Sequence, residues 1–116
     1  MESEPVQVQL YIARNGRAPF EEWLKRLKDR QARAKIQTRI IRLRLGNMGD
    51  AKAVGEGVQE LRIDYGPSYR LYFGQVGGAT VLLLCGGDKG TQATDIKKAK
   101  EYWADYQQRR KASDTL

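Results

Sequence analysis

The fold of this chain is decided by residues 57–100, which read GVQELRIDYGPSYRLYFGQVGGATVLLLCGGDKGTQATDIKKAK. Two segments of this stretch, 59–65 and 69–73, alternate apolar with polar residues, which is the period of a half-buried strand. A third segment, 81–85, is apolar at every position and indicates a central strand buried on both faces. The glycine pair at 77–78 predicts a hairpin turn. We therefore expect three consecutive strands in a meander.

One strand and two helices are expected before the meander. Residues 6–12 alternate, with one face formed by Val6, Val8, Leu10 and Ile12. Pro19 suits the first position of a helix, and Asp29 is a suitable cap for a second one. We expect these two helices to form a hairpin. The glycine-rich residues 46–57 show no clear period and predict an irregular connector.

A last helix is expected after the meander. Residues 86–90 indicate a loop, and Thr91 or Thr94 is expected to cap the helix that follows. Apolar residues at helical spacing form its inner face: Ile96, Ala99, Trp103 and Tyr106.

The length of 116 residues suits one domain with one hydrophobic core. The sequence predicts an α+β fold with the element order β-α-α-β-β-β-α. We expect a mainly antiparallel sheet, with an N-terminal helical hairpin and a C-terminal helix packed mainly on one sheet face. Residues 1–116 form a single domain in this prediction, with fraying at 1–5 and at 111–116.

Positive charge is concentrated in one part of the chain. The net charge is +7 and the isoelectric point is about 9.7. Residues 17–44 hold ten Lys or Arg against three Asp or Glu, and the remainder is balanced. Such a segment indicates a polyanion or an acidic protein as partner, and a solvated helix face is the alternative. A basic stripe lies beside the apolar stripe of the second helix and consists of Lys35, Arg39 and Arg42.

The residue types that are missing exclude several kinds of site. The chain has no histidine, so chemistry near neutral pH must use Arg, Lys, Tyr or carboxylates. Its one cysteine, Cys85, lies in an apolar run and is expected to be a small buried hydrophobe. The sequence has no metal-ligand pattern, Walker A loop or histidine-based triad, and we expect no cofactor and no metal.

The chain has the features of a cytoplasmic protein. Its acidic, polar N-terminus does not resemble a signal peptide. No apolar run approaches the ~20 residues that a membrane helix needs. A single cysteine is also compatible with a reducing compartment. We expect a cytoplasmic location and no membrane partner.

A cationic site is predicted on the polar face of the meander. If the hairpin pairs residues of equal parity, Glu60, Arg62, Arg70 and Tyr72 share the face opposite the apolar one. We expect this face to be open, with Lys89 at the end of the sheet. Arg offers planar paired donors and Lys a point charge, so together they suit a phosphodiester. Cross-strand ion pairs that serve solubility are the alternative for the same pattern.

Several motifs in this region together resemble those of a known family. The segments concerned are Glu60-Leu61-Arg62, Tyr65-Gly66-Pro67-Ser68-Tyr69-Arg70-Leu71-Tyr72, Leu83-Leu84-Cys85-Gly86-Gly87-Asp88-Lys89 and Gln92-Ala93-Thr94-Asp95-Ile96. They are similar to the Gp49-like or HigB-type addiction-module killer proteins of the RelE/ParE toxin superfamily, over about residues 6–106. The resemblance implies a compact toxin of a type II toxin–antitoxin pair, with a helix-turn-helix antitoxin as partner.

The resemblance also implies a target and a set of site residues. The RelE and HigB branches cut mRNA on the ribosome, whereas the ParE branch poisons DNA gyrase. Carried onto this chain, the resemblance makes Arg62, Arg70 and Lys89 the cationic site, with Tyr72 as helper. It favours a metal-independent mRNA interferase, with a gyrase inhibitor that cuts nothing and a plain nucleic-acid-binding module as alternatives.

Each of these residues has an expected role in RNA cleavage. Arg62 and Arg70 would stabilise the charge that develops on the phosphate. Lys89 would stabilise the phosphate or act as the base, and Tyr72 would stack on a base or assist proton transfer. The stripe of Lys35, Arg39 and Arg42 would dock on rRNA phosphates without reading sequence.

Overall fold

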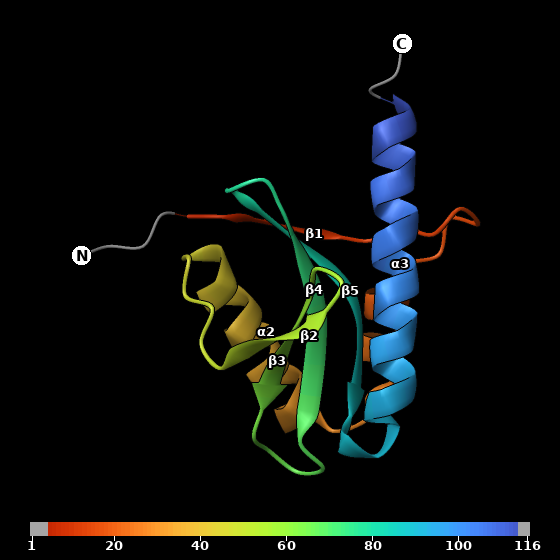
Figure 1. Ribbon diagram of the computed structural model, residues 1–116. Helices are drawn as coiled ribbons and strands as arrows, with labels where there is room; N and C mark the ends of the chain where they lie inside the picture. The colour runs from red at the N-terminus through yellow and green to blue at the C-terminus, as the bar shows by residue number, and fades with distance from the viewer. Residues whose placement is uncertain (1–4, 114–116) are drawn as a thin grey trace.

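The computed structural model describes residues 5–113 and places helices on both faces of a five-stranded sheet (Figure 1). Along the chain the elements are β1 (Gln7–Leu10), α1 (Pro19–Arg26), α2 (Arg30–Arg44), β2 (Ala51–Gly55), β3 (Val58–Ile63), β4 (Tyr69–Val76), β5 (Thr80–Asp88), the short 3-10 helix η1 (Lys89–Thr91) and α3 (Gln92–Ser113). The fold class is α+β, as the sequence predicts. Within the described residues, no helix combines the length and the hydropathy that crossing a bilayer requires.

The sheet is mixed, with the strand order β1-β5-β4-β3-β2. β1 runs parallel to β5, and the other three pairings are antiparallel. The middle strand is β4, so the prediction that 81–85 form the central strand is wrong by one place. β5 is apolar on both faces because α1 packs on one face and α3 on the other. It also extends to Asp88, so 86–88 belong to the strand and not to the predicted loop.

The sheet has one strand more than the predicted order β-α-α-β-β-β-α contains. β2 lies inside residues 46–57, where we expected an irregular connector, and it pairs with β3. Glu56 and Gly57 form the turn between them, and both have a positive φ, of 56° and 86°. A two-residue hairpin turn requires this geometry, but glutamate is an unusual residue for it. The strand character of β2 therefore depends on its pairing with β3 and is not visible in its own residues.

The helices do not share one face of the sheet, which corrects a second prediction. α1 packs on β5, and α2 packs on β1 and β3, whereas α3 lies on the opposite face. Figure 1 shows α3 running along one side of the sheet, with α2 on the other. Pro19 begins α1, and the Asp29 carboxylate caps α2 by accepting two backbone N–H groups, as predicted. Because α1 and α2 each pack on the sheet, their pairing as a hairpin is not confirmed.

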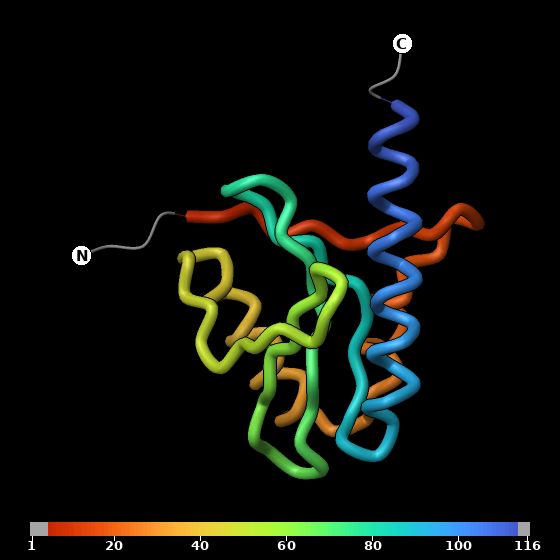
Figure 2. The backbone as a smooth tube through the Cα atoms, in the orientation of Figure 1, coloured from red at the N-terminus to blue at the C-terminus, as the bar shows by residue number. Residues whose placement is uncertain are grey.

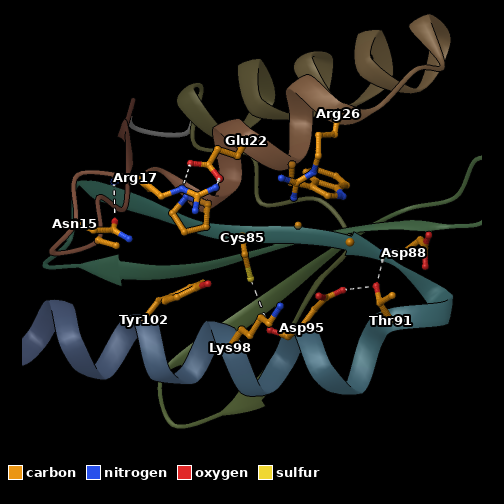
Figure 3. Close-up of a pocket in the computed structure, with 15 residues that line it drawn as sticks. Asn15, Arg17, Glu22, Arg26, Cys85, Asp88, Thr91, Asp95, Lys98 and Tyr102 are labelled. Atoms are coloured by element: carbon orange, nitrogen blue, oxygen red, sulfur yellow. Dashed lines mark hydrogen bonds and ion pairs between the residues drawn. The ribbon is translucent and has the colours of Figure 1, made fainter.

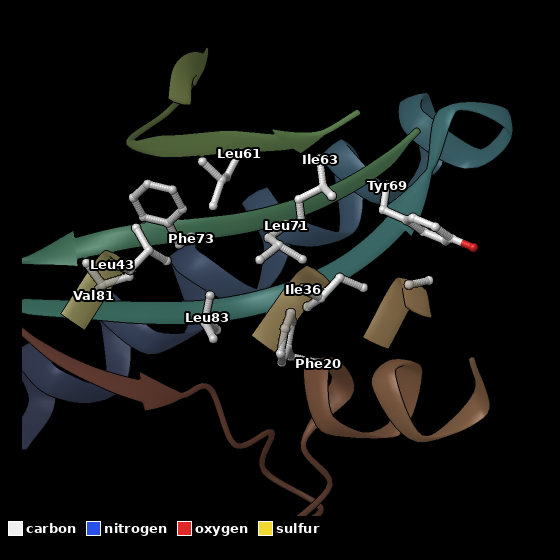
Figure 4. Packing of buried hydrophobic residues seen from close by; sticks show 11 residues of the cluster. Phe20, Ile36, Leu43, Leu61, Ile63, Tyr69, Leu71, Phe73, Val81 and Leu83 are labelled. Carbon is white, nitrogen blue, oxygen red and sulfur yellow. The ribbon is translucent and has the colours of Figure 1, made fainter. Parts of the chain in front are cut away.

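The first core lies between the sheet and the helices α1 and α2 (Figure 4). The period-two pattern correctly assigns four strand residues to this core, which are Leu61, Ile63, Leu71 and Phe73. β1 adds Val8 and Leu10, and Val6 just before it packs on the same core, but Ile12 is 46% exposed and does not continue this face as predicted. The chain leaves the sheet after Leu10, and Tyr11 turns into the second core instead.

The second core lies under α3. Its buried members include Tyr72, Leu82, Leu84, Cys85, Ala99 and Trp103. Gly74 makes room for the indole of Trp103, because a Cβ at Gly74 would collide with that ring. α3 thereby comes close to the sheet face that carries the polar residues of β3 and β4.

α3 begins directly after η1, whose first backbone N–H groups are capped by Asp88. We expected Thr91 or Thr94 to cap the last helix. Thr94 lies inside α3 and therefore does not cap it. The helix continues to Ser113, so residues 111–113 are helical in this structure. The predicted fraying of 1–4 and 114–116 lies outside the described residues.

The segment after β1 crosses α3, as the backbone trace shows (Figure 2). At this crossing the Tyr11 hydroxyl donates to Asp105 Oδ2 at 2.6 Å, and Arg14 Nε lies 2.8 Å from Asp105 Oδ1. Arg109 of α3 donates to the backbone carbonyl of Ile12 at 2.6 Å. These contacts join the N-terminal strand to the second half of α3.

Candidate functional site

The cross-strand register brings the predicted polar residues onto one face. In the pairing of β3 with β4, Glu60 lies opposite Tyr72, and Arg62 lies opposite Arg70. In the pairing of β4 with β5, the position opposite Arg70 is two residues before Lys89. The parity prediction is therefore confirmed for the two strands, and the three cations lie toward one end of the sheet.

This polar face is not open, contrary to the prediction. Glu60, Arg70 and Tyr72 are 1%, 4% and 0% exposed. They are buried because α3 packs on their side of the sheet, through Trp103 and Ala99. Arg62 is half-buried and Lys89 is exposed. Of the four residues proposed for catalysis, only these last two reach solvent.

A buried polar network surrounds the Glu60 carboxylate. The Tyr72 hydroxyl donates to Glu60 Oε2 at 3.1 Å, and the side-chain amide of Gln92 donates to the same oxygen at 2.8 Å. Arg70 Nε lies 3.8 Å from Oε2, and Lys52 Nζ lies 3.9 Å from Oε1. The sequence pattern offered Glu60 only as a member of a solvent-exposed cross-strand ion pair, and it did not predict Lys52 or Gln92 as neighbours of the carboxylate. β2 was not recognised, and the place of Gln92 follows only from the packing of α3.

Tyr72 is held as a proton donor. Burial raises the pKa of Tyr72 far above its ordinary value, and the charge and hydrogen bond of Glu60 raise it further. The phenol therefore remains protonated at neutral pH and donates to the carboxylate. Because the ring is fully buried, stacking on a nucleic-acid base is not open to Tyr72 in this structure.

Arg62 and Lys89 differ from Arg70 in having no side-chain partner among the residues that the structure describes. Arg70 donates from Nη1 to the backbone carbonyl of Ser68 at 2.9 Å and lies against Glu60. Within residues 5–113, the side chains of Arg62 and Lys89 make no hydrogen bond or ion pair. These two cations are therefore available to an external anion. Arg62 would offer the paired N–H donors of its planar guanidinium, and Lys89 would offer a compact ammonium charge.

α2 carries a second cationic surface. The helix contains six Lys or Arg and no Asp or Glu, and none of the six pairs with a carboxylate in the described part of the chain. Lys35, Arg39 and Arg42 line one cleft of about 340 Å³ together with Asp64 and Tyr65. The Lys35 ammonium lies 5.1 Å from the centroid of the Tyr65 ring. Arg39 Nη2 is buried without a hydrogen-bond partner. The structure thus brings the three predicted docking residues together.

A larger cleft, of about 560 Å³, lies between α1 and α3 over the end of β5 (Figure 3). Its charges balance, since three cations are matched by three carboxylates: Arg17, Arg26 and Lys98 against Glu22, Asp88 and Asp95. Burial raises the pKa of the Cys85 thiol to about 12, so the thiol is protonated and not a nucleophile at neutral pH. This cleft therefore suits an anion less well than the two cationic surfaces do.

Gly86 and Gly87 at the floor of this cleft have a packing role. A Cβ on Gly86 would collide with the indole of Trp23, and a Cβ on Gly87 would collide with the Asp95 carboxylate. The two glycines let α1 and α3 approach β5 from opposite sides. This explains the glycine pair before Lys89 without a phosphate-binding loop.

The sequence was also compared with those of known proteins. The sequence model of the family described as phage derived protein Gp49-like (DUF891) matches residues 22–103. The chain belongs to the Gp49-like family. The matched Gp49-like segment includes every residue that we proposed for catalysis and for docking. The family is associated with the toxins of toxin–antitoxin systems, so it also suggests an antitoxin as partner.

One relative of this Gp49-like chain is an uncharacterized protein of Haemophilus influenzae (strain ATCC 51907 / DSM 11121 / KW20 / Rd). The two sequences are 56% identical over 81 residues, which is 70% of this chain and 82% of the relative. The similarity supports the family and leaves the reaction to be argued from the site.

Proposed function

We propose that this chain is the toxin of a type II toxin–antitoxin pair and cuts mRNA on the ribosome without a metal, as the HigB and RelE branches of the RelE/ParE superfamily do. The observation that carries the proposal is positive charge on two surfaces that has no carboxylate partner within residues 5–113. One is α2, with six such cations, and the other is the sheet end with Arg62 and Lys89. Like-charged neighbours on a helix are destabilising, which favours a polyanionic partner as the reason for their presence.

The chemistry assigned to the site is transfer of a phosphodiester within the RNA. The ribose 2′-OH gives up its proton and attacks the adjacent phosphorus, the bond from phosphorus to the 5′-oxygen breaks, and that oxygen takes up a proton from water. Negative charge builds on the non-bridging oxygens during this transfer. Donors placed in advance at these oxygens lower the barrier. Arg62 and Lys89 reach solvent and would contact the phosphate. Arg70 lies opposite Arg62 and would add its charge from beneath, with Tyr72 as helper within the buried network.

Lys89 has two possible roles in this scheme, as a phosphate ligand or as the base that takes the 2′-OH proton. The substitution Lys89→Arg separates them, because arginine keeps the charge but does not act as a base near neutral pH. Retained cleavage supports phosphate binding, and lost cleavage with retained RNA binding supports the base.

α2 would attach the toxin to the ribosome. Contacts to phosphates position a protein on RNA without reading its sequence, which suits a helix whose charged residues are all Lys or Arg. Lys35, Arg39 and Arg42 share one cleft and would form the centre of this contact. The proposal places the protein in the cytoplasm, where the ribosomes are.

The partner in this proposal is a helix-turn-helix antitoxin. Silencing the toxin requires covering of Arg62 and Lys89 or displacement of α3, so we expect acidic antitoxin side chains near Arg62 or Arg70. A complex in which the sheet end and α3 are both free and undistorted would exclude this mode of inhibition.

A ParE-like gyrase inhibitor is a second candidate, and one observation favours it. Ile41 and Leu45 of the α2 region are 53% and 62% exposed, large apolar side chains that suit a protein surface.

Purified ribosomes with a defined mRNA provide the test. We expect wild-type protein to cut the translated message and leave the same RNA intact without ribosomes. Lys89→Ala provides a matched variant, because Lys89 is exposed and its loss should leave the fold unchanged. Intact mRNA together with gyrase-linked DNA breaks in cells would instead support the gyrase inhibitor.

A further inference from the structure

Glu60 is a fully buried carboxylate that joins four elements of the fold. It lies on β3, accepts hydrogen bonds from Tyr72 of β4 and Gln92 of α3, and has two cations nearby. These are Arg70 Nε at 3.8 Å and Lys52 Nζ of β2 at 3.9 Å. The residue is 1% exposed, in the part of the sheet where Arg62 and Arg70 lie opposite one another.

The stability of the fold does not explain this carboxylate. Burying an ion pair costs several kcal/mol per ion, and apolar residues of similar volume usually serve stability as well or better. The pairing is also imperfect, because Glu60 Oε1 and Arg70 Nε are both buried without a hydrogen bond. A costly and incompletely satisfied charge at this position indicates a role other than packing.

The geometry indicates that Glu60 acts on Arg70. The Glu60 carboxylate and the Ser68 carbonyl hold the Arg70 guanidinium from two sides, Glu60 Oε2 at 3.8 Å and Ser68 O at 2.9 Å. Without the carboxylate, Arg70 would carry an uncompensated charge directly opposite Arg62. Like charges in directly opposite positions of a sheet repel each other. The Arg70 guanidinium would then lose its defined place relative to Arg62.

We propose that Glu60 is a positioning residue that acts through Arg70. Its carboxylate holds the Arg70 guanidinium beside Arg62, so that the two charges are aligned on the phosphate of the substrate RNA. This inference rests on the proposed function. It differs from a role in substrate binding, because Glu60 is buried and of the wrong sign to contact a phosphate.

Because Glu60 is negatively charged, the proposal predicts opposite effects of Glu60→Gln on RNA binding and on the rate of cleavage. The substitution removes one negative charge from a cationic site, so RNA binding should be as tight as before or tighter. KM should therefore not rise, while kcat per folded molecule should fall about tenfold or more, the pattern of a missing transition-state interaction. Glu21→Gln is the matched control: Glu21 is exposed on α1 and pairs with Lys25, so its loss should leave both constants unchanged.

A double-mutant cycle tests whether Glu60 acts through Arg70. In the background Arg70→Gln, the further substitution Glu60→Gln should change kcat by less than about twofold, because the group that it positions is gone. Independent roles predict that the two losses multiply. A multiplied loss, or a wild-type kcat in Glu60→Gln alone, would overturn the inference.

A spectroscopic readout keeps the inference testable apart from activity. In nitrogen-15 spectra, the Nε resonance of Arg70, which lies 3.8 Å from the Glu60 carboxylate, should shift and broaden in Glu60→Gln because the guanidinium loses its defined place. An unchanged Arg70 resonance in the folded variant would overturn the positioning contact. A wild-type protein that cuts no ribosome-bound mRNA would remove the proposed function, whereas cleavage with a kcat insensitive to Glu60 would remove this inference only.

Discussion

Arg62 lies directly opposite Arg70 in the antiparallel register of β3 and β4. The two like charges are accommodated because their surroundings differ. Arg70 is buried beside Glu60, and Arg62 is half-buried with no side-chain partner in the described chain. The two arginines, which look equivalent in the sequence, should therefore respond differently to the same substitution.

Arg62→Ala should remove activity and leave stability unchanged. It removes a repulsive neighbour of Arg70 and no ion pair, so the free energy of unfolding should change by no more than about 0.5 kcal/mol. Loss of a donor that acts on developing phosphate charge should slow mRNA cleavage on the order of a hundredfold. Urea unfolding and the ribosome cleavage assay measure the two effects. Full activity in a folded Arg62→Ala protein would remove Arg62 from the site.

Arg70→Ala should lower stability by about 3 kcal/mol, because it leaves the Glu60 charge buried without its nearest cation. The expected loss follows from the burial of Arg70, which the sequence pattern placed on an open face. The double substitution Glu60→Leu with Arg70→Met should recover most of the loss, since no charge then remains buried. Urea unfolding of the single and double variants decides the matter. A double variant no more stable than Arg70→Ala would contradict the explanation.

Neutralising the α2 stripe should weaken ribosome binding without affecting catalytic chemistry. We expect the triple variant K35Q/R39Q/R42Q to bind ribosomes more weakly and to show a flatter dependence on salt, by about one log–log unit for each phosphate that the variant no longer neutralises. Glutamine is chosen over glutamate because the Arg39 guanidinium is partly buried against Gly49. The control K28Q/K97Q/R110Q removes three charges elsewhere on the surface. Equal effects in both variants would show that only net charge matters.

Gly74→Ala should destabilise the protein by about 1–3 kcal/mol. The new Cβ collides with the rigid indole of Trp103, which must move and take α3 with it. Gly78→Ala is the matched control, because no atom lies within 4 Å of a Cβ at Gly78. Thermal unfolding of both variants should show a loss for Gly74→Ala alone. Equal melting temperatures would mean that α3 does not depend on this close approach.

Stability should fall at alkaline pH, and Tyr11 should account for part of the fall. Burial raises the pKa of Tyr11 to about 12, with further contributions from the hydrogen bond and charge of Asp105. The folded state holds the proton more tightly than the unfolded state, whose pKa is near 10, so this stabilisation is complete below about pH 10. It is lost as the pH rises toward 12 and amounts to about 2–3 kcal/mol.

Tyr11→Phe isolates this contribution from those of the other buried phenols and the thiol. The variant lacks the titrating group, so its unfolding free energy should decline less between about pH 9 and pH 11 than that of the wild type. Urea unfolding at several pH values gives the comparison. Parallel declines in the two proteins would exclude Tyr11 as a source of the pH dependence.

The parts that the sequence predicts correctly depend on local rules. Alternation in 59–65 and 69–73 has a period of two, so Arg62 and Arg70 had to share a face once the segments paired. Pro19 and Asp29 mark the starts of α1 and α2 because their backbone and side-chain preferences act within a few residues. The basic stripe of α2 follows in the same way from the helical repeat.

The parts that the sequence did not predict depend on residues far apart in the chain. β2 is a strand because β3 pairs with it, and Ile12 is exposed because the chain leaves the sheet after Leu10. Both depend on neighbours that the local pattern does not specify.

The packing of α3 over the candidate site is the most important feature that the sequence did not predict. Gly74 and Gly87 remove side chains from one face of the sheet, and α3 fills the space with Trp103 and Asp95. That packing buries Glu60 and Arg70 and leaves Arg62 and Lys89 accessible. The sequence by itself determined which charges share a face. Only the tertiary structure decided which of them meet solvent, because burial depends on what a distant helix covers.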